Sequence, residues 1–224
     1  MHFTENLTIL FSMTPKHLQQ ITHFVYEMGI HQKTPRSGLW FLGSGKQSVA
    51  EHLFRTTMIA YALSHLTPKA DKHKVIFMAL VHDIGEGRVS DLNYVHQRYG
   101  RLAEGNAVKD IAVSVPFGKE IEQAYLEEQA KETLEAKLVK DADNLEWLAT
   151  MREEETKGNA KAKGWAVDAS KRMKTPAGKA IAKLLLSTHP DDWWHDDKDP
   201  WWIDRTKSHQ QWKPAKKTNQ KGQK

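Results

Sequence analysis

The chain has 224 residues, a formal charge of +5, a pI of about 9.2 and no cysteine. This length suits one globular domain with a sizeable core, and the absence of cysteine excludes disulfide bridges and thiolate metal sites. No segment approaches the roughly 18 apolar residues of a membrane span, and residues 1–13 lack the basic start of a signal peptide, so we expect a cytoplasmic protein.

Three Thr-Pro pairs mark expected helix starts, at Thr14-Pro15, Thr67-Pro68 and Thr175-Pro176. A threonine side chain accepts hydrogen bonds from the first free N–H groups of a helix, and proline suits the first helical position. The first helix should run to Met28, because apolar residues recur at helical spacing and Gly29 ends the run.

A loop rich in glycine follows the first helix, and the apolar periodicity then predicts several more helices. They are expected over residues 48–65, from Pro68 to Asp83, over 102–113, within 119–155 as one long or two consecutive helices, and over 177–188. No alternating strand pattern and no internal repeat is evident. The sequence therefore predicts an all-α fold, with a single globular helical bundle over residues 1–212.

The C-terminal part combines tryptophans, aspartates and then lysines. Segment 189–202, HPDDWWHDDKDPWW, holds four of the eight tryptophans. Such rings can stack on bases, but more often they cap a core or a dimer contact. Residues 213–224 hold five lysines and no acid, and without them the formal charge of residues 1–212 is zero. We therefore expect a basic disordered tail and no specific nucleic-acid partner.

The stretch FMALVHDIGEG, residues 77–87, places His82 and Asp83 at the end of an apolar helix, with Glu86 one turn later. Burying a bare carboxylate costs several kcal/mol or more unless it is neutralised, paired or bound to a metal. Residues three and four apart share a helix face, so the three side chains can approach one ion. A capped helix end explains an isolated His-Asp pair equally well.

Two further helices supply partners for this pair. His52 lies at helical spacing with Thr56 and Leu63 on an inward-facing stripe, although an isolated core histidine is usually only hydrogen-bonded. Asp143 also lies on an inward face, whereas Asp141 is nearer the helix edge and is the weaker candidate. Two imidazoles and two carboxylates suit a divalent ion such as Mn, Fe, Co, Ni, Zn or Mg, with open positions for hydrolysis.

At these residues the chain resembles the HD-domain phosphohydrolases, and most closely the branch that contains the 5′-deoxynucleotidases. The family pattern is matched by His52, His82-Asp83 and Asp143, in the contexts SVAEH and EAKLVKDADNLE. The resemblance covers roughly residues 15–190. It implies an all-α HD domain, one divalent metal ion on those four ligands, and removal of the 5′-phosphate from (deoxy)nucleoside monophosphates.

The resemblance also implies roles for other residues. Glu86 would orient or deprotonate the attacking water, and Asp91 would act near the leaving 5′-oxygen or contact the sugar, with a cap or turn carboxylate as the alternative for Asp91. In this branch an arginine binds phosphate beside a tryptophan that packs on the sugar. Arg36 and Trp40 match these two residues, although three residues separate them here and the deoxynucleotidases have them adjacent.

Other charged residues have two interpretations each. Arg55 either faces the site or pairs with an acid such as Glu51 or Glu86. Lys137 and Lys140 are expected on a solvated helix face, with neutralisation of phosphate as the alternative.

Two alternative functions also stay open. One is hydrolysis of a nucleoside triphosphate or an alarmone at the same metal site, and the other is a non-catalytic regulatory module that binds the metal. The resemblance and the spare aromatic surface near the C-terminus predict a homodimer.

Overall fold

The computed structural model describes residues 13–196 and residue 201. The expected tail at 213–224, and with it the boundary at residue 212, lies outside the described residues, as do Trp202 and segment 1–12. The helices are, in chain order, α2 (Pro15–Met28), the 3₁₀ helix η1 (Gly29–Gln32), α3 (Leu39–Leu42), α4 (Val49–His65), α5 (Lys72–Val81), α6 (Glu86–Val89), α7 (His96–Tyr99), α8 (Glu104–Ser114), α9 (Gly118–Ala130), α10 (Leu134–Thr156), α11 (Ala160–Ser170) and α12 (Pro176–Leu185).

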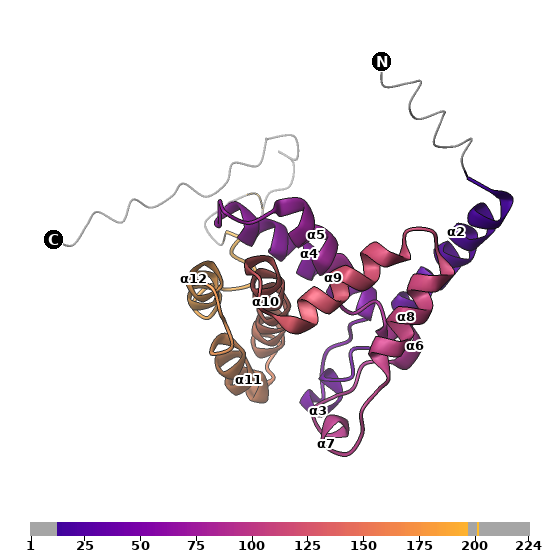
Figure 1. The fold of residues 1–224 in the computed structure, drawn as a ribbon. Coiled ribbons are helices and arrows are strands. Elements are labelled where there is room, and N and C mark those ends of the chain that lie inside the picture. Colours follow the sequence, from indigo (N-terminus) through magenta and orange to yellow (C-terminus); the bar gives the residue numbers. More distant parts are fainter. Residues whose placement is uncertain (1–12, 197–200, 202–224) are drawn as a thin grey trace.

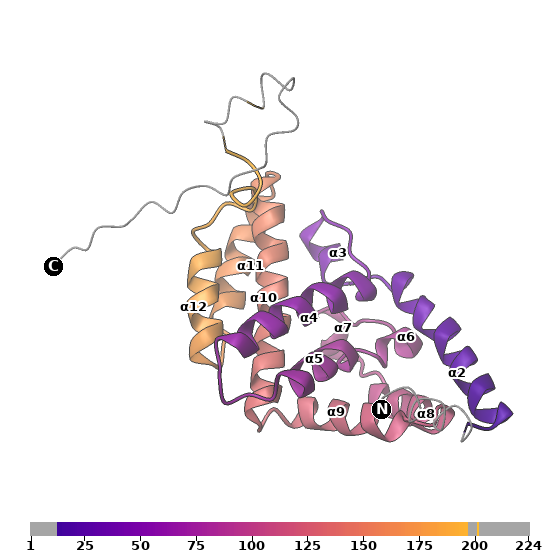
Figure 2. The same ribbon diagram turned by 90° about the horizontal axis from the view of Figure 1, so that it is seen from above.

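The long helix α10 organises the fold. Helices α11 and α12 pack beside it, and the antiparallel pair α4 and α5 crosses it on another side (Figures 1 and 2). Helix α9 packs against α5 and α10, α8 packs against α9 and α6, and α2 extends along the far edge of the molecule (Figure 2). Between residues 13 and 196 no β-strand forms, only one isolated bridge between Pro35 and Ser48. The all-α prediction is confirmed.

Two hydrophobic clusters meet where α5 ends. The larger lies among α4, α5, α10, α11 and α12, and it includes Leu63, Met78 and Leu145. The smaller lies between the end of α5 and the α8–α9 pair, and it includes Val81 and Ile84. Residues 82 and 83 therefore stand at the junction of the two clusters, which holds their backbone in place.

The expected helix starts are confirmed in two of three cases. The side chains of Thr14 and Thr175 cap α2 and α12, each with proline at the next position. The start at Pro68 is wrong, because residues from Thr67 to Ala70 form a turn and α5 begins only at Lys72. The carboxylate of Asp71 accepts hydrogen bonds from the N–H groups of residues 73 and 74, and this cap sets the start.

Segment 119–155 forms two helices rather than one. Helix α9 ends at Ala130, before Lys131, whose φ of 54° is left-handed, and the Thr133 side chain then caps α10. Helix α11 was not predicted. It follows Gly158, which has a φ of 101°, and the Asn159 side chain caps it. Its alanine-rich face packs on α10 although its periodicity is weak.

The surface of the described chain exposes several aromatic rings. Trp193 and Trp194, from the acidic C-terminal segment, are 75% and 42% exposed, so neither is sealed into the core. Among the described residues, none of the helices combines the length and the apolar character needed to cross a membrane.

Candidate metal centre

Three helices bring the central residues together. Ser48 and Glu51 form a capping box that fixes the first turn of α4 and directs His52 into the interior, where it is fully buried. Helix α5 ends at Val81, and His82 and Asp83 follow in the turn toward α6. Asp143 lies in the middle of α10, which packs on both α4 and α5.

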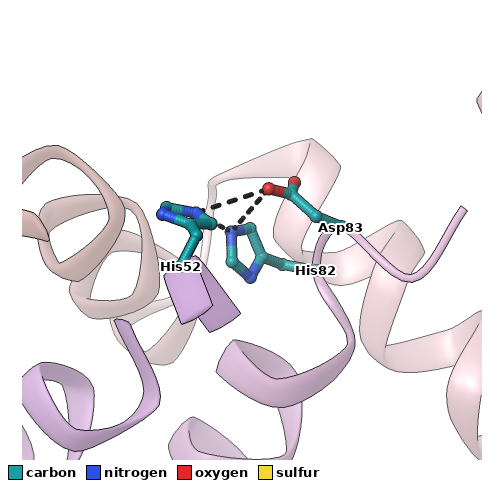
Figure 3. A group of neighbouring side chains, drawn as sticks. All are labelled: His52, His82 and Asp83. Carbon is teal, nitrogen blue, oxygen red and sulfur yellow. Dashed lines mark hydrogen bonds and ion pairs between the residues drawn. The ribbon is translucent and has the colours of Figure 1, made fainter. Parts of the chain in front are cut away.

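The side chains of His52, His82 and Asp83 converge on one point (Figure 3). The Nε2 atoms of the two histidines lie 3.4 Å apart. The Oδ2 atom of Asp83 lies 3.4 Å from Nε2 of His52 and 3.3 Å from Nε2 of His82. Ligand atoms that share one divalent ion at about 2.1 Å stand about 3 to 3.4 Å apart, so this arrangement fits such an ion.

The other ring nitrogens explain why a cation fits here. Nδ1 of His52 lies 2.9 Å from a carboxylate oxygen of Glu146, and Nδ1 of His82 lies 2.8 Å from the carbonyl oxygen of Ala79. Both partners are acceptors, so each Nδ1 donates its proton. In the neutral rings each Nε2 then carries a lone pair, and these two lone pairs face each other and a carboxylate. Such an arrangement requires positive charge between the atoms.

The pKa values of His82 and Asp83 also indicate that positive charge is favoured at this position. Burial lowers the pKa of His82, but the adjacent Asp83 carboxylate outweighs burial and raises that pKa to about 9. Burial raises the pKa of Asp83, but His82, His52 and Arg36 together hold it well below its usual range. A divalent ion supplies this positive charge without a proton.

Asp143 reaches the same centre from α10. Its Oδ1 atom lies 3.4 Å from Nε2 of His52, and its Oδ2 atom accepts a hydrogen bond of 2.6 Å from Nζ of Lys140. Burial raises the pKa of Asp143, but Lys140 and the two histidines bring it far below the usual value. Lys137 is exposed, as expected, whereas Lys140 lines the cavity, a position that fits the alternative of phosphate neutralisation better than a solvated helix face.

Asp141, the weaker candidate, faces away from the centre. Its carboxylate accepts hydrogen bonds from the N–H groups of Lys174 and Thr175 and from the Thr175 hydroxyl, at 2.6 to 2.7 Å. The Thr175 hydroxyl in turn accepts from Gly178 N–H at the start of α12. Asp141 therefore joins α10 to α12, and its role is structural.

A cavity of about 270 Å³ opens beside the cluster, and Arg36, Asp83, Glu86, Asp91 and Asp143 line it. Nη1 of Arg36 lies 3.2 Å from Oδ2 of Asp83 and 3.6 Å from Oε2 of Glu86. Within the described part of the chain, Nε of Arg36 and Oε2 of Glu86 are buried without a hydrogen-bond partner, and Nε lies 3.8 Å from Oδ2 of Asp91. Buried polar atoms without partners are rare, and here a donor and an acceptor remain available for a ligand in the same cavity.

The pKa of the Glu86 carboxyl is strongly raised by its surroundings. Burial and then the repulsion of Asp83 raise its pKa to about 10, against the opposing effect of Arg36. A cation bound beside Asp83 would offset that repulsion and favour the carboxylate form.

Asp91 holds the loop that carries Arg36. Its Oδ2 atom accepts a 2.9 Å hydrogen bond from Ser37 N–H, and its backbone carbonyl accepts a 2.7 Å bond from the Ser37 hydroxyl. The preceding residue, Ser90, has φ 73° and ψ 169°, a conformation that costs a residue with a side chain about 1–3 kcal/mol. The carboxylate thus serves as a turn anchor and also lines the cavity.

The aromatic residue in the cavity differs from the expected one. Trp40 is 59% exposed and packs edge-on against His96, and it is not among the residues that line the cavity. Trp147 lies there instead, and an added Cβ at Gly38 would stand 3.1 Å from its ring, so the Arg36 loop approaches it closely.

Among the residues of the cavity wall that sequence reasoning missed are Tyr94 and Arg172. The Arg172 guanidinium lies over the Tyr94 ring, 5.7 Å from its centroid, and donates to its hydroxyl. Neither residue belongs to a recognisable motif, so only the fold brings them to the site.

Arg55 does not line the cavity but forms the ion pair that was its other interpretation, with acids other than the two given as examples. It pairs with Glu146 at 2.7 Å and with Glu153 at 2.6 Å, both on α10. Glu146 was also missed, although it follows Asp143 by three residues and therefore shares its helix face. Burial raises the pKa of Glu146, but His52, Arg55 and Gln47 lower it to about 2.

Comparisons with known proteins agree with this arrangement. The family model for the HD domain matches residues 28–185. The 5′-deoxynucleotidase hdd1 of Schizosaccharomyces pombe is 31% identical over 137 residues, which cover 56% of this chain and 68% of that protein. The 5′-deoxynucleotidase HDDC2 of Danio rerio is 31% identical over 145 residues, covering 62% of this chain and 71% of that protein. A solved structure of a conserved hypothetical protein from Pyrococcus furiosus has a TM-score of 0.65 at 26% identity, covering 75% of this chain and 99% of that one.

Proposed function

Because this chain belongs to the HD-domain family, we propose that it is a divalent-metal-dependent phosphohydrolase that removes the 5′-phosphate from nucleoside and deoxynucleoside monophosphates. Two relatives that are 31% identical to it are 5′-deoxynucleotidases. The observation that carries the proposal is the convergence of His52, His82 and Asp83 beside a cavity that arginines and three further carboxylates line.

The proposed ligands of the ion are Nε2 of His52, Nε2 of His82, Asp83 and Asp143. This mixed set of nitrogen and oxygen donors suits Mn, Co, Fe, Ni, Zn or Mg. When bound, the ion would polarise a phosphoryl oxygen and lower the pKa of a coordinated water.

Arg36 is the proposed phosphate-binding residue. Its guanidinium lies beside the Asp83 carboxylate, and its Nε–H group has no hydrogen-bond partner among the described residues, with Oδ2 of Asp91 3.8 Å away. A guanidinium presents parallel N–H donors that match two phosphate oxygens. Lys140 lines the same cavity and adds a second positive charge toward the phosphate.

Glu86 and Asp91 are the proposed catalytic carboxylates. Glu86 would orient the attacking water and accept its proton while the water oxygen forms the new bond to phosphorus. The bond from phosphorus to the 5′-oxygen breaks, and that oxygen leaves with a proton. Asp91 would deliver this proton or contact the sugar, and its position on the cavity wall supports either role.

The nucleoside is proposed to lie against Trp147 and Tyr94. Both rings line the cavity, whereas Trp40, the residue expected on the sugar, does not. The Arg172 guanidinium lies over the Tyr94 ring and lines the same cavity, so it adds a planar cation to this wall.

A substrate panel tests the proposed function. The purified full chain is incubated with nucleoside mono-, di- and triphosphates and an alarmone, each with several divalent ions, and released phosphate and pyrophosphate are measured. Release of phosphate from monophosphates supports the proposal. Release of pyrophosphate from triphosphates or alarmones would favour the second candidate, and a metal-loaded protein that hydrolyses none of them would favour a regulatory module.

We further propose a cytoplasmic homodimer without a specific nucleic-acid partner. Helix α2 buries none of its residues and exposes Val25 and Tyr26, and α4 exposes Phe54 and Met58, so apolar surface is available for a second copy. Light scattering at micromolar concentration measures the mass, and a monomer would refute the dimer. The division into residues 1–212 and a basic tail at 213–224 likewise stays a proposal.

A further inference from the structure

We propose that Glu146 is a positioning residue that holds His52 in the form able to bind the metal ion. Its carboxylate accepts the Nδ1 proton of His52, so that Nε2 is left unprotonated and directed at the ion. The inference rests on the proposed metal site and assigns it a residue that lies outside the ligand set.

The contact between the two side chains is short and dry. Nδ1 of His52 lies 2.9 Å from Oε2 of Glu146, and both side chains are 0% exposed. The opposite ring nitrogen, Nε2, lies 3.4 Å from Oδ2 of Asp83 and from Oδ1 of Asp143. With the proton fixed on Nδ1, the ring turns its lone pair toward the convergence point.

Glu146 is itself fixed in one orientation. Its Oε1 atom accepts hydrogen bonds from Nε and Nη2 of Arg55 at 2.9 and 2.7 Å, from Nε2 of Gln47 at 2.6 Å, and from the Thr150 hydroxyl at 3.2 Å. These donors hold Oε1, and Oε2 is the oxygen left for His52. The carboxylate cannot rotate without breaking several contacts at once.

The two histidines are therefore supported differently. His82 donates its Nδ1 proton to a neutral backbone carbonyl, that of Ala79. His52 donates to a charged carboxylate, which increases the electron density on the ring and strengthens its bond to a metal. Substitution at position 146 can thus change one ligand while the other keeps its support.

Glu146→Gln changes this support by a single atom. Arg55 and Gln47 donate N–H groups, so they keep the carbonyl oxygen of the new side chain in the Oε1 position. Its NH2 group then occupies the Oε2 position. Because this group is a hydrogen-bond donor, Nδ1 of His52 must lose its proton to accept from it. The imidazole proton then lies on Nε2, where it takes up the lone pair that would bind the ion.

The matched control is Glu153→Gln, the same change at the other carboxylate that Arg55 contacts. Glu153 has no contact with His52 in the described structure, and it does not line the cavity. The parent chain and both variants are purified without metal, and their unfolding midpoints show whether they are folded. The dissociation constant for Co²⁺ is measured by competition with a chromophoric chelator, and the visible spectrum of the Co²⁺ form is recorded.

We expect Glu146→Gln to weaken Co²⁺ binding by about 10- to 100-fold and to alter the visible spectrum. Glu153→Gln should stay within about twofold of the parent. If folded Glu146→Gln binds Co²⁺ as tightly as the parent, the inference is overturned. It is also overturned if Glu153→Gln loses as much Co²⁺ affinity as Glu146→Gln, because the hydrogen bonds around Arg55 would then affect binding only through the stability of the fold. A parent chain that binds no divalent ion would instead refute the proposed function.

A measurement on the unsubstituted protein covers the case in which Glu146→Gln does not fold. Nitrogen-15 NMR of the Zn²⁺-loaded chain distinguishes the two ring nitrogens of each histidine. We expect a proton on Nδ1 of His52 and none on Nε2. A proton on Nε2 of His52 in the loaded protein would overturn the inference.

Discussion

Nε2 of His52 and Nε2 of His82 lie 3.4 Å apart, and the Nδ1 atom of each ring faces an oxygen acceptor. Two neutral imidazoles in this arrangement repel each other unless a positive charge lies between them. The metal centre is thus part of the electrostatic balance of the interior, and its removal should affect more than catalysis.

Asp83→Ala is expected to abolish metal binding, because Asp83 supplies the carboxylate that approaches both histidines. Elemental analysis of protein purified without chelator should find about one divalent ion per chain in the parent and none in this variant. Asp110→Ala, on the exposed side of α8, is the control and should keep the ion. A parent that is active without metal would contradict the whole scheme.

Glu86→Gln should lower turnover by about 10²-fold or more, because an amide cannot accept the proton of the attacking water. The metal content should not change, since Glu86 is not a proposed ligand. Steady-state kinetics and metal analysis of the same preparation test both statements, and unchanged turnover would remove Glu86 from the mechanism.

Arg36→Lys keeps the positive charge but loses the fork of donors. Losing one charge-assisted hydrogen bond to phosphate costs about 1.5 kcal/mol, so KM should rise about tenfold. The control is Arg98→Lys on α7, an exposed position outside the cavity lining. If KM is the same in Arg36→Lys and the parent, another cation must bind the phosphate.

Tyr94→Ala and Trp40→Ala separate the two candidate contacts with the nucleoside. Tyr94 lines the cavity and Trp40 does not, and stacking of a base on an aromatic ring contributes about 1–3 kcal/mol. Tyr94→Ala should therefore raise KM for a nucleotide by about tenfold or more but not for p-nitrophenyl phosphate. Trp40→Ala should leave both values near the parent's. The reverse result would restore Trp40 as the sugar contact.

Asp141→Ala should destabilise the fold and leave the metal content unchanged. The variant leaves two backbone N–H groups and a hydroxyl near the start of α12 without their acceptor. We expect a loss of about 3 kcal/mol in the free energy of unfolding, measured with urea. Loss of metal from a folded Asp141→Ala protein would show that Asp141 acts at the centre.

The sequence predicted the residues that belong to a recognisable motif and the helices whose apolar residues recur with a clear helical periodicity. His52, His82, Asp83 and Asp143 are recognisable because a ligand-type residue in an apolar stripe needs a partner. The α5 start was misplaced because Asp71 and Pro68 both offer a helix start, and only packing decides between them.

The missed residues depend on contacts between distant parts of the chain. In the sequence, Glu146 does not differ from the other acidic residues of its helix. Only its contacts with His52 and Arg55 in the fold set it apart. Tyr94 and Arg172 are 78 residues apart and carry no pattern. Lys140 was expected in solvent because helix periodicity alone does not reveal a cavity.

Helix α10 carries its functional side chains at fixed angular positions, with Asp143 at the centre and Glu146 behind His52. Inserting one residue between them would rotate everything downstream by about 100° and shift it along the axis by about 1.5 Å. Only one of the two carboxylates could then keep its place. In the proposed metal site, the spacing between Asp143 and Glu146 therefore decides whether one helix can place one acid beside the ion and another behind His52.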